Sequence, residues 1–260
     1  MNLSVIKIGG NIIDNEQSLI SFLEQLAEIK GKKILVHGGG KLATRLAEQL
    51  NIPQQMMDGR RITDAETLKI ITMVYAGYIN KNIVALLQGN GANAIGICGA
   101  DNDTIRAHKR SHPTIDYGFV GDIENINANF LKQLVMDGMV PVVAPLTHDG
   151  KGQLLNTNAD TIAQEIATSL SSYFNVHLVY SFEKAGVLEN AEDESTVIPY
   201  INPSNYRELK ASGKIFAGMI PKLDNAFAAL DKGVKKVIIG KASSLQSLVD
   251  GREGTTIIAD

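Results

Sequence analysis

Residues 33–41 read KILVHGGGK, an apolar run that ends in a histidine, three glycines and a lysine. Such a run predicts a strand covered on both faces, and a helical pattern follows it over residues 41–49. A glycine-rich turn from a strand into a helix offers free backbone amides to an anion. The stretch therefore indicates an α/β fold with a candidate anion site, although tight packing alone could also explain the glycines.

The same alternation of short β-branched runs and longer helical patterns continues along the whole chain. It predicts an α/β three-layer sandwich, with helices on both faces of a mainly parallel central sheet. The expected strands cover residues 3–8, 33–37, 94–98, 140–144, 176–181, 236–239 and 255–258. The expected helices cover residues 16–29, 41–49, 64–87, 129–136, 158–170, 203–211 and 221–230. Residues 103–125 differ in composition and predict a protruding hairpin, a candidate lid.

Length and composition exclude several classes of protein. The 260 residues suffice for one large domain, and no linker separates parts of the chain. We expect two lobes that share one sheet, about residues 1–172 and 173–260. The net charge of −3 argues against nucleic-acid binding, and the single cysteine excludes an intrachain disulfide. No leader or membrane segment is recognised, so a cytoplasmic protein without a membrane partner is expected.

Two lysines occupy positions that are unfavourable for a positive charge, which favours a role for them in a ligand-binding site. Lys7 stands late in the apolar strand VIKI and is followed by Gly9 and Gly10. A buried ammonium is costly unless paired, whereas ligands of α/β proteins bind at the carboxyl ends of strands. Lys222 directly follows Pro221 at a predicted helix start, where a cation opposes the helix dipole. Both lysines could instead be solvated surface residues.

Two further motifs carry weaker signals. Residues 156–160 read NTNAD, in which Asn158 suits a helix N-cap, while Asn156 is not needed for capping. Residues 59–64 read GRRITD and place two arginines before a helix, where one guanidinium could clamp a carboxylate.

Common catalytic signatures are missing or misplaced. The chain has no nucleophile elbow and no P-loop sequence. Residues 89–94, GNGANA, fit a dinucleotide fingerprint by letter but follow a helix and precede a strand. His108 and His112 lack the neighbours of a metal set, so no protein metal site is expected. Cys98 is read as a core residue.

The candidate residues are lysines, glycine turns and one acidic residue, and they stand at the ends of strands and helices. This set suits an anionic ligand whose charge is redistributed during reaction. Phosphoryl transfer fits best, because its catalysis is mostly positioning and charge neutralisation.

The ordered motifs IKIGG, VHGGG, GRRIT, NTNAD and GMIPK resemble the amino acid kinase family, in particular its acetylglutamate kinases, over essentially the whole chain. The resemblance implies the amino acid kinase fold and ATP-dependent phosphorylation of the side-chain carboxylate of an N-acylated glutamate, a step of arginine biosynthesis. It also implies that Mg²⁺ arrives on the ATP phosphates.

The resemblance also assigns roles to residues. Lys7 and Lys222 would stabilise the transferring phosphoryl group, and Asp160 would hold both lysines. The residues Gly39, Gly40, Arg61 and Asn156 would bind the acyl amino acid, with Arg61 on its α-carboxylate. The nucleotide would lie against Gly9, Gly10, Glu183, Lys184, Gly186, Leu188, Lys214 and Phe216.

The sequence departs from the family pattern at two places. Glu183 and Lys184 replace a common Asp-Val pair, and Arg60 replaces a leucine before Arg61. The extra cation Arg60 suggests a hypothesis, in which the acyl group carries its own carboxylate, as succinyl does.

Alternatives remain at this point. Kinases of aspartate, carbamate, glutamate, uridylate or acylated aminoadipate share parts of the motifs. A non-catalytic sensor could keep the fold, and a scaffold could use a helix face containing Ile70, Ile71, Val74 and Tyr78. Arginine-inhibited relatives carry an extra N-terminal helix, whereas here a strand is expected from residue 3. A homodimer insensitive to arginine is therefore expected.

Overall fold

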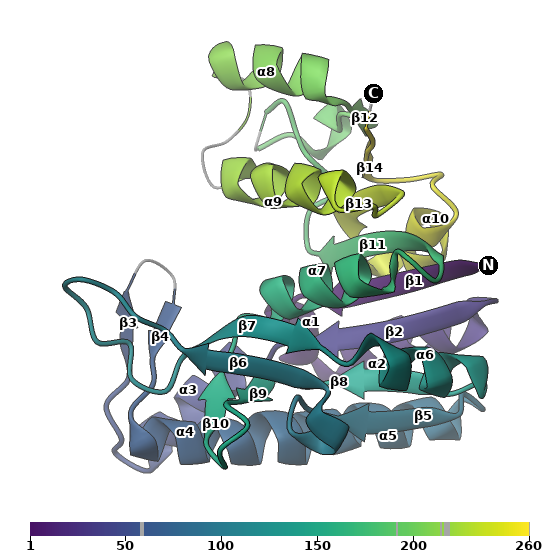
Figure 1. The fold of residues 1–260 in the computed structure, drawn as a ribbon. Helices are drawn as coiled ribbons and strands as arrows, with labels where there is room; N and C mark the ends of the chain where they lie inside the picture. The colour runs from purple at the N-terminus through teal and green to yellow at the C-terminus, as the bar shows by residue number, and fades with distance from the viewer. Residues whose placement is uncertain (58–59, 191, 214, 216–218, 260) are drawn as a thin grey trace.

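The computed structural model describes residues 1–57, 60–190, 192–213, 215 and 219–259. Its centre is an eight-stranded sheet (Figure 1). In spatial order the strands are β12 (Tyr200–Ile201), β14 (Thr255–Ile257), β13 (Lys236–Lys241), β11 (Asn175–Phe182), β1 (Asn2–Ile8), β2 (Lys32–His37), β8 (Val140–Val143) and β5 (Ala94–Ile97). Only the pair β13 and β14 is antiparallel, so the prediction of a mainly parallel sheet is confirmed.

The order of strands separates the chain at β1 and β11. Every strand of this sheet after residue 172 lies on the β11 side, and every earlier one lies on the β1 side. Figure 1 shows α8 and α9 above this junction and the rest of the helices around it and below. The sheet thus runs through both parts of the chain, while their division into two lobes stays a prediction.

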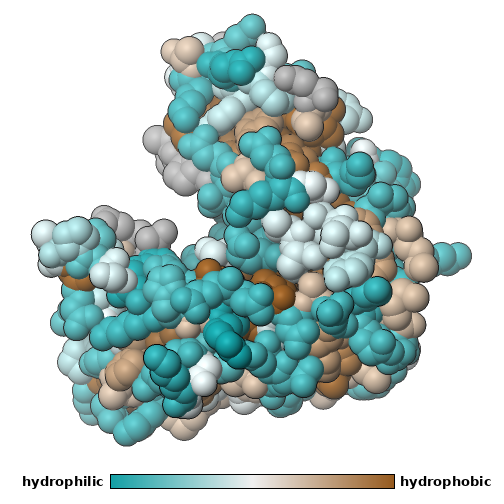
Figure 2. Space-filling view, in the orientation of Figure 1, coloured by the Kyte–Doolittle hydropathy of each residue, from teal (hydrophilic) through white to brown (hydrophobic). Residues whose placement is uncertain are grey.

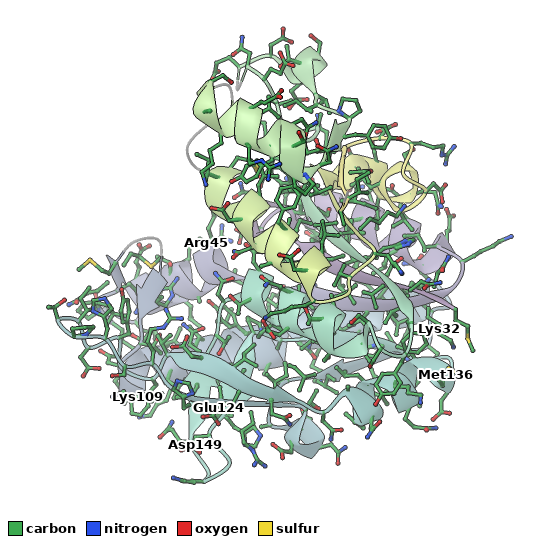
Figure 3. All side chains as sticks on the ribbon, turned by 45° about the horizontal axis from the view of Figure 1, so that its top comes forward. Lys32, Arg45, Lys109, Glu124, Met136 and Asp149 are labelled. Atoms are coloured by element: carbon green, nitrogen blue, oxygen red, sulfur yellow. The ribbon has the colours of Figure 1, made fainter. Side chains whose placement is uncertain are left out.

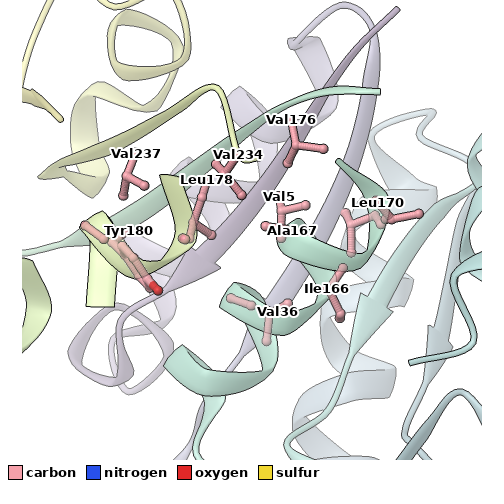
Figure 4. Packing of buried hydrophobic residues seen from close by; sticks show 14 of the residues in the cluster. Val5, Val36, Ile166, Ala167, Leu170, Val176, Leu178, Tyr180, Val234 and Val237 are labelled. Atoms are coloured by element: carbon pink, nitrogen blue, oxygen red, sulfur yellow. The ribbon is translucent and has the colours of Figure 1, made fainter. Parts of the chain in front are cut away.

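Helices cover both faces of the sheet and complete three layers. One hydrophobic cluster packs α6 (Ala128–Met136), α7 (Ala159–Leu170), α8 (Pro203–Ala211) and α9 (Ile220–Asp231) against one face. The other cluster packs α2 (Glu16–Glu28), α3 (Gly40–Gln49), α4 (Ala65–Thr72), α5 (Asn80–Gly89) and α10 (Leu245–Val249) against the opposite face. Figure 4 shows Ile166 and Leu170 of α7 beside Val5, Val36 and Val176 of three neighbouring strands.

Alternation along β1 explains which side chains reach which layer. Leu3 and Val5 join the α7 cluster, whereas Ile6 and Ile8 join the opposite cluster. Because successive side chains of a strand point to opposite faces, Lys7 belongs to the α7 side of the sheet.

Smaller elements extend from the strand ends. A second sheet contains β10 (Leu154–Asn156), β9 (Leu146–His148), β6 (Ile105–Lys109) and β7 (Gly121–Ile126). The strands β3 (Gln55–Met57) and β4 (Arg60–Ile62) form a separate hairpin. The short helices are α1 (Gly10–Ile13), η2 (Asp101–Asp103), η3 (Glu194–Thr196) and η5 (Ala242–Ser244). The pairing of β6 with β7 confirms the hairpin predicted at residues 103–125, and its action as a lid stays a prediction.

The predicted helix 64–87 is not a regular α-helix. Its middle, η1 (Met73–Ile79), is π-helical and joins α4 to α5. The continuous helix Ala65–Gly89 is long and apolar enough to cross a membrane by length and composition alone. The structure packs Ile70, Ile71 and Val74 into the core, so these three residues do not provide the exposed helix face that the scaffold alternative would need. Of that set only Tyr78 is exposed, at 65%.

A buried histidine anchors the turn that follows β2. His37 is fully buried, and its Nδ1 lies 2.8 Å from the Gly38 carbonyl oxygen. Its Nε2 lies 3.2 Å from the Asn80 side-chain nitrogen, which also donates to the Val142 carbonyl. Neutral imidazole with the proton on Nδ1 satisfies both contacts. Burial lowers the pKa of His37 to about 4.

This lowered pKa predicts loss of stability in acid. Between pH 6.5 and 4 the unfolded chain binds the His37 proton and the folded chain does not, so stability present above pH 6.5 is lost as the pH falls. At pH 5, this difference in the protonation of His37 lowers the free energy of unfolding by about 2 kcal/mol. Half-buried His177, whose pKa burial also lowers to about 4, acts in the same direction.

Urea unfolding at pH 7 and pH 5 measures this loss. We expect His37→Gln to reduce the difference between the two pH values by about 2 kcal/mol. The exposed His112→Gln is the control and keeps the wild-type difference. An undiminished difference in His37→Gln would contradict the assignment.

Candidate active site

A cavity of about 260 Å³ lies where β1, α3 and α7 meet. Its wall includes Lys7, four glycines of the turns that follow β1 and β2, Arg61 and the start of α7. The full lining is Lys7, Gly10, Gly38, Gly39, Gly40, Met56, Arg61, Tyr75, Arg110, Val120, Pro145, Asn156, Thr157, Asn158, Ala159 and Asp160. Figure 2 shows a broad hollow between the part of the surface that carries the β3–β4 hairpin and the part that carries α8 and α9.

Lys7 and Asp160 form an ion pair in this cavity. The Lys7 Nζ lies 2.8 Å from Asp160 Oδ1, and the two side chains are 16% and 32% exposed. The buried Oδ1 has no hydrogen-bond partner among the described residues. The pair is therefore held by charge and position. It compensates an ammonium that the strand pattern would otherwise leave unpaired.

Helix N-termini add positive potential to the same cavity. Gly10 begins α1, Gly40 begins α3, and Asn158 caps α7 by accepting from the backbone nitrogens of Asp160 and Thr161. The N-cap predicted at Asn158 is thus confirmed. Because helix N-termini attract negative charge, their meeting at one cavity suits an anionic ligand.

The glycine turns have structural reasons as well as functional ones. Gly39 has a φ of +144°, and a side chain there would overlap Cδ1 of Ile79 and touch Tyr75. A Cβ on Gly9 would lie 3.2 Å from the Ser181 carbonyl oxygen and 3.4 Å from Phe182 Cα. The packing explanation therefore holds at both positions, and Gly39 also lines the cavity.

Arg61 is buried and is held by neutral groups. Its side chain donates to the Gly40 carbonyl at 2.9 Å, to Thr44 Oγ1 at 2.8 Å and to Gln54 Oε1. Among the residues that the structure describes, no carboxylate pairs with it. A buried guanidinium with only neutral partners retains a full charge for an incoming carboxylate.

Thr63 connects Asn156 to Arg61, because its hydroxyl donates to the Arg61 carbonyl and accepts from the Asn156 side chain. The Asn156 side-chain nitrogen donates to Thr63 Oγ1 at 3.0 Å, and its backbone nitrogen donates to the Phe119 carbonyl. The asparagine that capping did not need therefore faces the cavity.

Tyr75 was missed from the sequence. It lies in η1, and burial raises the pKa of its phenol, which the Arg61 guanidinium beside it lowers in turn. The sequence offered no reason to select Tyr75. Its side chain reaches the glycines because of the π-helical turn, and no local sequence pattern predicts such a turn.

Other predicted residues lie away from the cavity. Lys222 stands in α9 with its Nζ 5.1 Å from the centre of the Phe182 ring, and it is not among the lining residues. A Cβ on Gly9 would lie 3.4 Å from Phe182 Cα, so the residue that contacts Lys222 also adjoins the first glycine turn. No contact between Asp160 and Lys222 is observed within the described parts of the chain.

The candidate nucleotide residues form a separate group. Glu183, Lys184, Gly186 and Leu188 follow β11, and none lines the cavity of Lys7. A Cβ on Gly186 would meet Thr255 Oγ1 and Val197, while Leu188 is buried and pairs with Val197. Lys214 and Phe216 lie outside the described residues, as do Gly59 and the side chain of Arg60.

No protein metal centre emerges from the described residues, because no three His, Cys, Asp or Glu side chains gather there. Among the lining residues that the structure describes, Asp160 alone carries a carboxylate, and it is paired with Lys7. These residues can neutralise and position anionic groups, and the described lining contains no serine, cysteine or histidine.

Comparison with known proteins decides the family. The profile of the amino acid kinase family matches residues 2–241. The chain belongs to the amino acid kinase family. Two similar relatives are the acetylglutamate kinases of Phocaeicola vulgatus, 57% identical over 94% of this chain and 95% of that one, and of Cytophaga hutchinsonii, 56% identical over 99% of each. The acetylglutamate kinase of Methanopyrus kandleri is 38% identical over 98% of this chain and 100% of that one.

Solved structures share the fold at low identity. The N-acetylglutamate synthase of Neisseria gonorrhoeae, solved with coenzyme A and N-acetyl-glutamate, has a TM-score of 0.81 at 20% identity over 100% of this chain and 59% of that chain. The carbamate kinase of Giardia lamblia bound to AMP-PNP has a TM-score of 0.71 at 16% identity over 99% and 98%. These likenesses support the amino acid kinase fold predicted from the motifs.

The Gly39 geometry predicts a selective loss of stability. Gly39→Ala forces a side chain into the positive-φ region against Ile79, and we expect a cost of about 1–3 kcal/mol. That cost lowers the melting temperature by about 2–10 °C in a chain of this size. Gly38→Ala is the matched control, because a Cβ there meets nothing within 4 Å. Equal melting temperatures in the two variants would rule out the strain.

Proposed function

We propose that this chain transfers the γ-phosphoryl group of ATP to the side-chain carboxylate of an N-acylated glutamate, with N-acetylglutamate as the reference substrate. The observation that carries the proposal is the Lys7–Asp160 ion pair, set in one cavity with Arg61 and the glycine turns. The names of the relatives support the same reaction, which belongs to arginine biosynthesis.

Each part of the substrate has a matching group. Arg61 and Asn156 would take the α-carboxylate, because Arg61 has no carboxylate partner among the described residues. The backbone at Gly39 and Gly40 would lie along the substrate. Its side-chain carboxylate would then point toward Lys7, which lies in the same cavity.

The chemical step needs no general base from the protein. A glutamate side-chain carboxylate is ionised at pH 7. One of its oxygens forms the new bond to the γ-phosphorus while the bond to the β,γ-bridging oxygen breaks, which yields an acyl phosphate and ADP. Lys7 would neutralise charge on the phosphoryl oxygens, and Asp160 would hold Lys7 in place.

Lys222 would complete the charge neutralisation from the other side. Because Lys222 lies against Phe182 and does not line the cavity, the proposal requires the part of the chain with α9 to approach the cavity when both substrates bind. The buried Asp160 Oδ1 without a hydrogen bond could then accept from Lys222 as well.

The nucleotide would lie between these lysines and the residues after β11. Gly9 and Gly10 would face its phosphates, and Glu183, Lys184, Gly186, Leu188, Lys214 and Phe216 remain the proposed pocket. Mg²⁺ would arrive on the phosphates, because Asp160, the one carboxylate in the described lining of the cavity, already pairs with Lys7. Bound there, Mg²⁺ would neutralise phosphate charge.

A homodimer in the cytoplasm is the proposed state of the protein. Exposed Met73 and Tyr78 on one long helix offer apolar area for a second copy. Light scattering should give twice the mass of one chain, and Tyr78→Asp should shift it toward the monomer. Tyr200→Asp, equally exposed on β12, is the control, and a monomeric wild-type protein would overturn the proposal.

ADP release in the presence of ATP, Mg²⁺ and N-acetylglutamate tests the reaction. We expect Lys7→Met and Lys222→Met each to lower kcat about 100- to 1,000-fold, because each removes a group that stabilises transferring charge. Lys69→Met, exposed on α4, is the control and should keep wild-type turnover. A protein that binds both substrates without releasing ADP would instead be a sensor.

Arg61→Met separates binding from chemistry. Loss of a charged anchor for the α-carboxylate should raise KM for N-acetylglutamate about 10- to 100-fold with a smaller change in kcat. Its folding is checked by the melting temperature, because Arg61 also donates to Gly40 and Thr44. An unchanged KM in a folded variant would show that the α-carboxylate binds at another residue.

A further inference from the structure

Gly40 leaves room at the cavity that neither its backbone nor its packing requires. Its φ lies outside the positive region that favours glycine. A Cβ built there would lie 3.7 Å from Arg61 Nη2 and 4.0 Å from the Tyr75 hydroxyl oxygen, and both are ordinary van der Waals distances. All three residues line the cavity. The room in front of Gly40 is therefore bordered by two polar groups and is available to a ligand.

Tyr75 lies along the glycine turn with its hydroxyl at the Gly40 end. Its ring atoms Cδ1 and Cε1 lie 3.3 and 3.4 Å from a Cβ built on Gly39, whereas its hydroxyl oxygen is the atom nearest to the Cβ built on Gly40 after Arg61 Nη2. The residue as a whole is 5% exposed. The apolar part of the ring thus packs on Gly39, and the polar end reaches the room in front of Gly40.

The Tyr75 hydroxyl can donate to a ligand. Arg61 forms a hydrogen bond with this side chain, and because a guanidinium has only donors, the phenol oxygen is the acceptor. The phenol proton then points away from Arg61. Burial raises the pKa of the phenol above its usual value, although Arg61 lowers it in part, so the proton is present at pH 7.

A second donor beside Arg61 has a purpose. A guanidinium holds a carboxylate by two parallel N–H groups along one edge, and both edges that can do so include Nη2. Nη2 of Arg61 already serves the Gly40 carbonyl and Thr44 Oγ1. A carboxylate on either edge must share Nη2 with these partners, so a separate donor nearby would strengthen its binding.

We propose that Tyr75 is a substrate-binding residue whose hydroxyl donates to the α-carboxylate of the N-acylated glutamate. The carboxylate would lie in the room in front of Gly40, between the phenol and the Arg61 guanidinium. This proposal rests on the proposed kinase function. It implies that the π-helical segment η1, which carries Tyr75, helps to select substrates that have an α-carboxylate.

The structure offers two matched controls. Tyr78 stands three residues after Tyr75 in the same π-helical segment, is 65% exposed and lines a different pocket. Arg45, labelled in Figure 3, follows Thr44 on α3 and pairs with Asp14, and it is not among the residues that line the cavity. They control for loss of a phenol hydroxyl and for loss of a nearby positive charge.

The test compares N-acetylglutamate with 4-acetamidobutanoate, which keeps the acetamide and the reacting carboxylate but has hydrogen in place of the α-carboxylate. With ATP and Mg²⁺, Tyr75→Phe should raise KM for N-acetylglutamate about 10-fold and leave kcat nearly unchanged, because it removes a hydrogen bond to a charged group that does not react. The kcat/KM for 4-acetamidobutanoate, which is measurable below saturation, should stay the same. Tyr78→Phe and Arg45→Met should change neither substrate's kinetics.

Gly40→Ala tests the same room without altering Tyr75. Its methyl group would occupy the place proposed for the α-carboxylate, so KM for N-acetylglutamate should rise by a similar factor. Since 4-acetamidobutanoate has no α-carboxylate, its kcat/KM should be kept. Both variants should melt close to the wild-type temperature, because the added methyl group meets only ordinary contacts and Tyr75→Phe keeps the ring.

Binding measured by calorimetry without ATP separates this inference from the proposed function. An unchanged KM for N-acetylglutamate in Tyr75→Phe, or an equal loss of kcat/KM for both compounds, would overturn the role of Tyr75 and leave the kinase function standing. Binding of N-acetylglutamate that is weakened by Tyr75→Phe and not by Tyr78→Phe, without ADP release from either compound, would support the role of Tyr75 and overturn the kinase function.

Discussion

The rest of the structure depends on the ion pair between Lys7 and Asp160. A lysine in the middle of a parallel sheet is tolerated because α7, which packs on the same face, brings a carboxylate to 2.8 Å from it. The pairing needs β1 and α7 in contact, and these elements are about 150 residues apart in the sequence. The fold therefore creates a fixed, compensated cation at a strand end, where an anionic ligand can approach it.

Around this pair the cavity holds Arg61, which has no charged partner among the described residues, and the starts of three helices. Arg61 is held by a carbonyl, a hydroxyl and an amide, and the α1, α3 and α7 N-termini add their dipoles. Buried His37 and Asn80 fix the glycine turn from behind. Such a site is organised before the ligand arrives, which is what phosphoryl transfer demands of a protein.

The sequence predicted the strands of the large parallel sheet well, because continuous apolar runs such as those at Val5 and Val36 have one reading in an α/β fold. It also placed Lys7, Arg61 and Asn156, which line one cavity. It did not find Tyr75, whose position depends on a π-helical turn, or Arg110, which lies in a hairpin of mixed composition. Neither residue breaks a local rule. Tyr75 gains its place from its contact with Gly39, and Arg110 gains its place from pairing with Asp122 within its own hairpin.

The central claim is that Lys7 and Lys222 converge on one migrating phosphoryl group. A crystal structure with ADP, a planar metal fluoride that mimics this group, and N-acetylglutamate tests it most directly. The account predicts the Nζ atoms of both lysines within hydrogen-bond distance of the fluoride ligands, and Asp160 between them. A fluoride held by Lys7 with Lys222 still against Phe182 would contradict it.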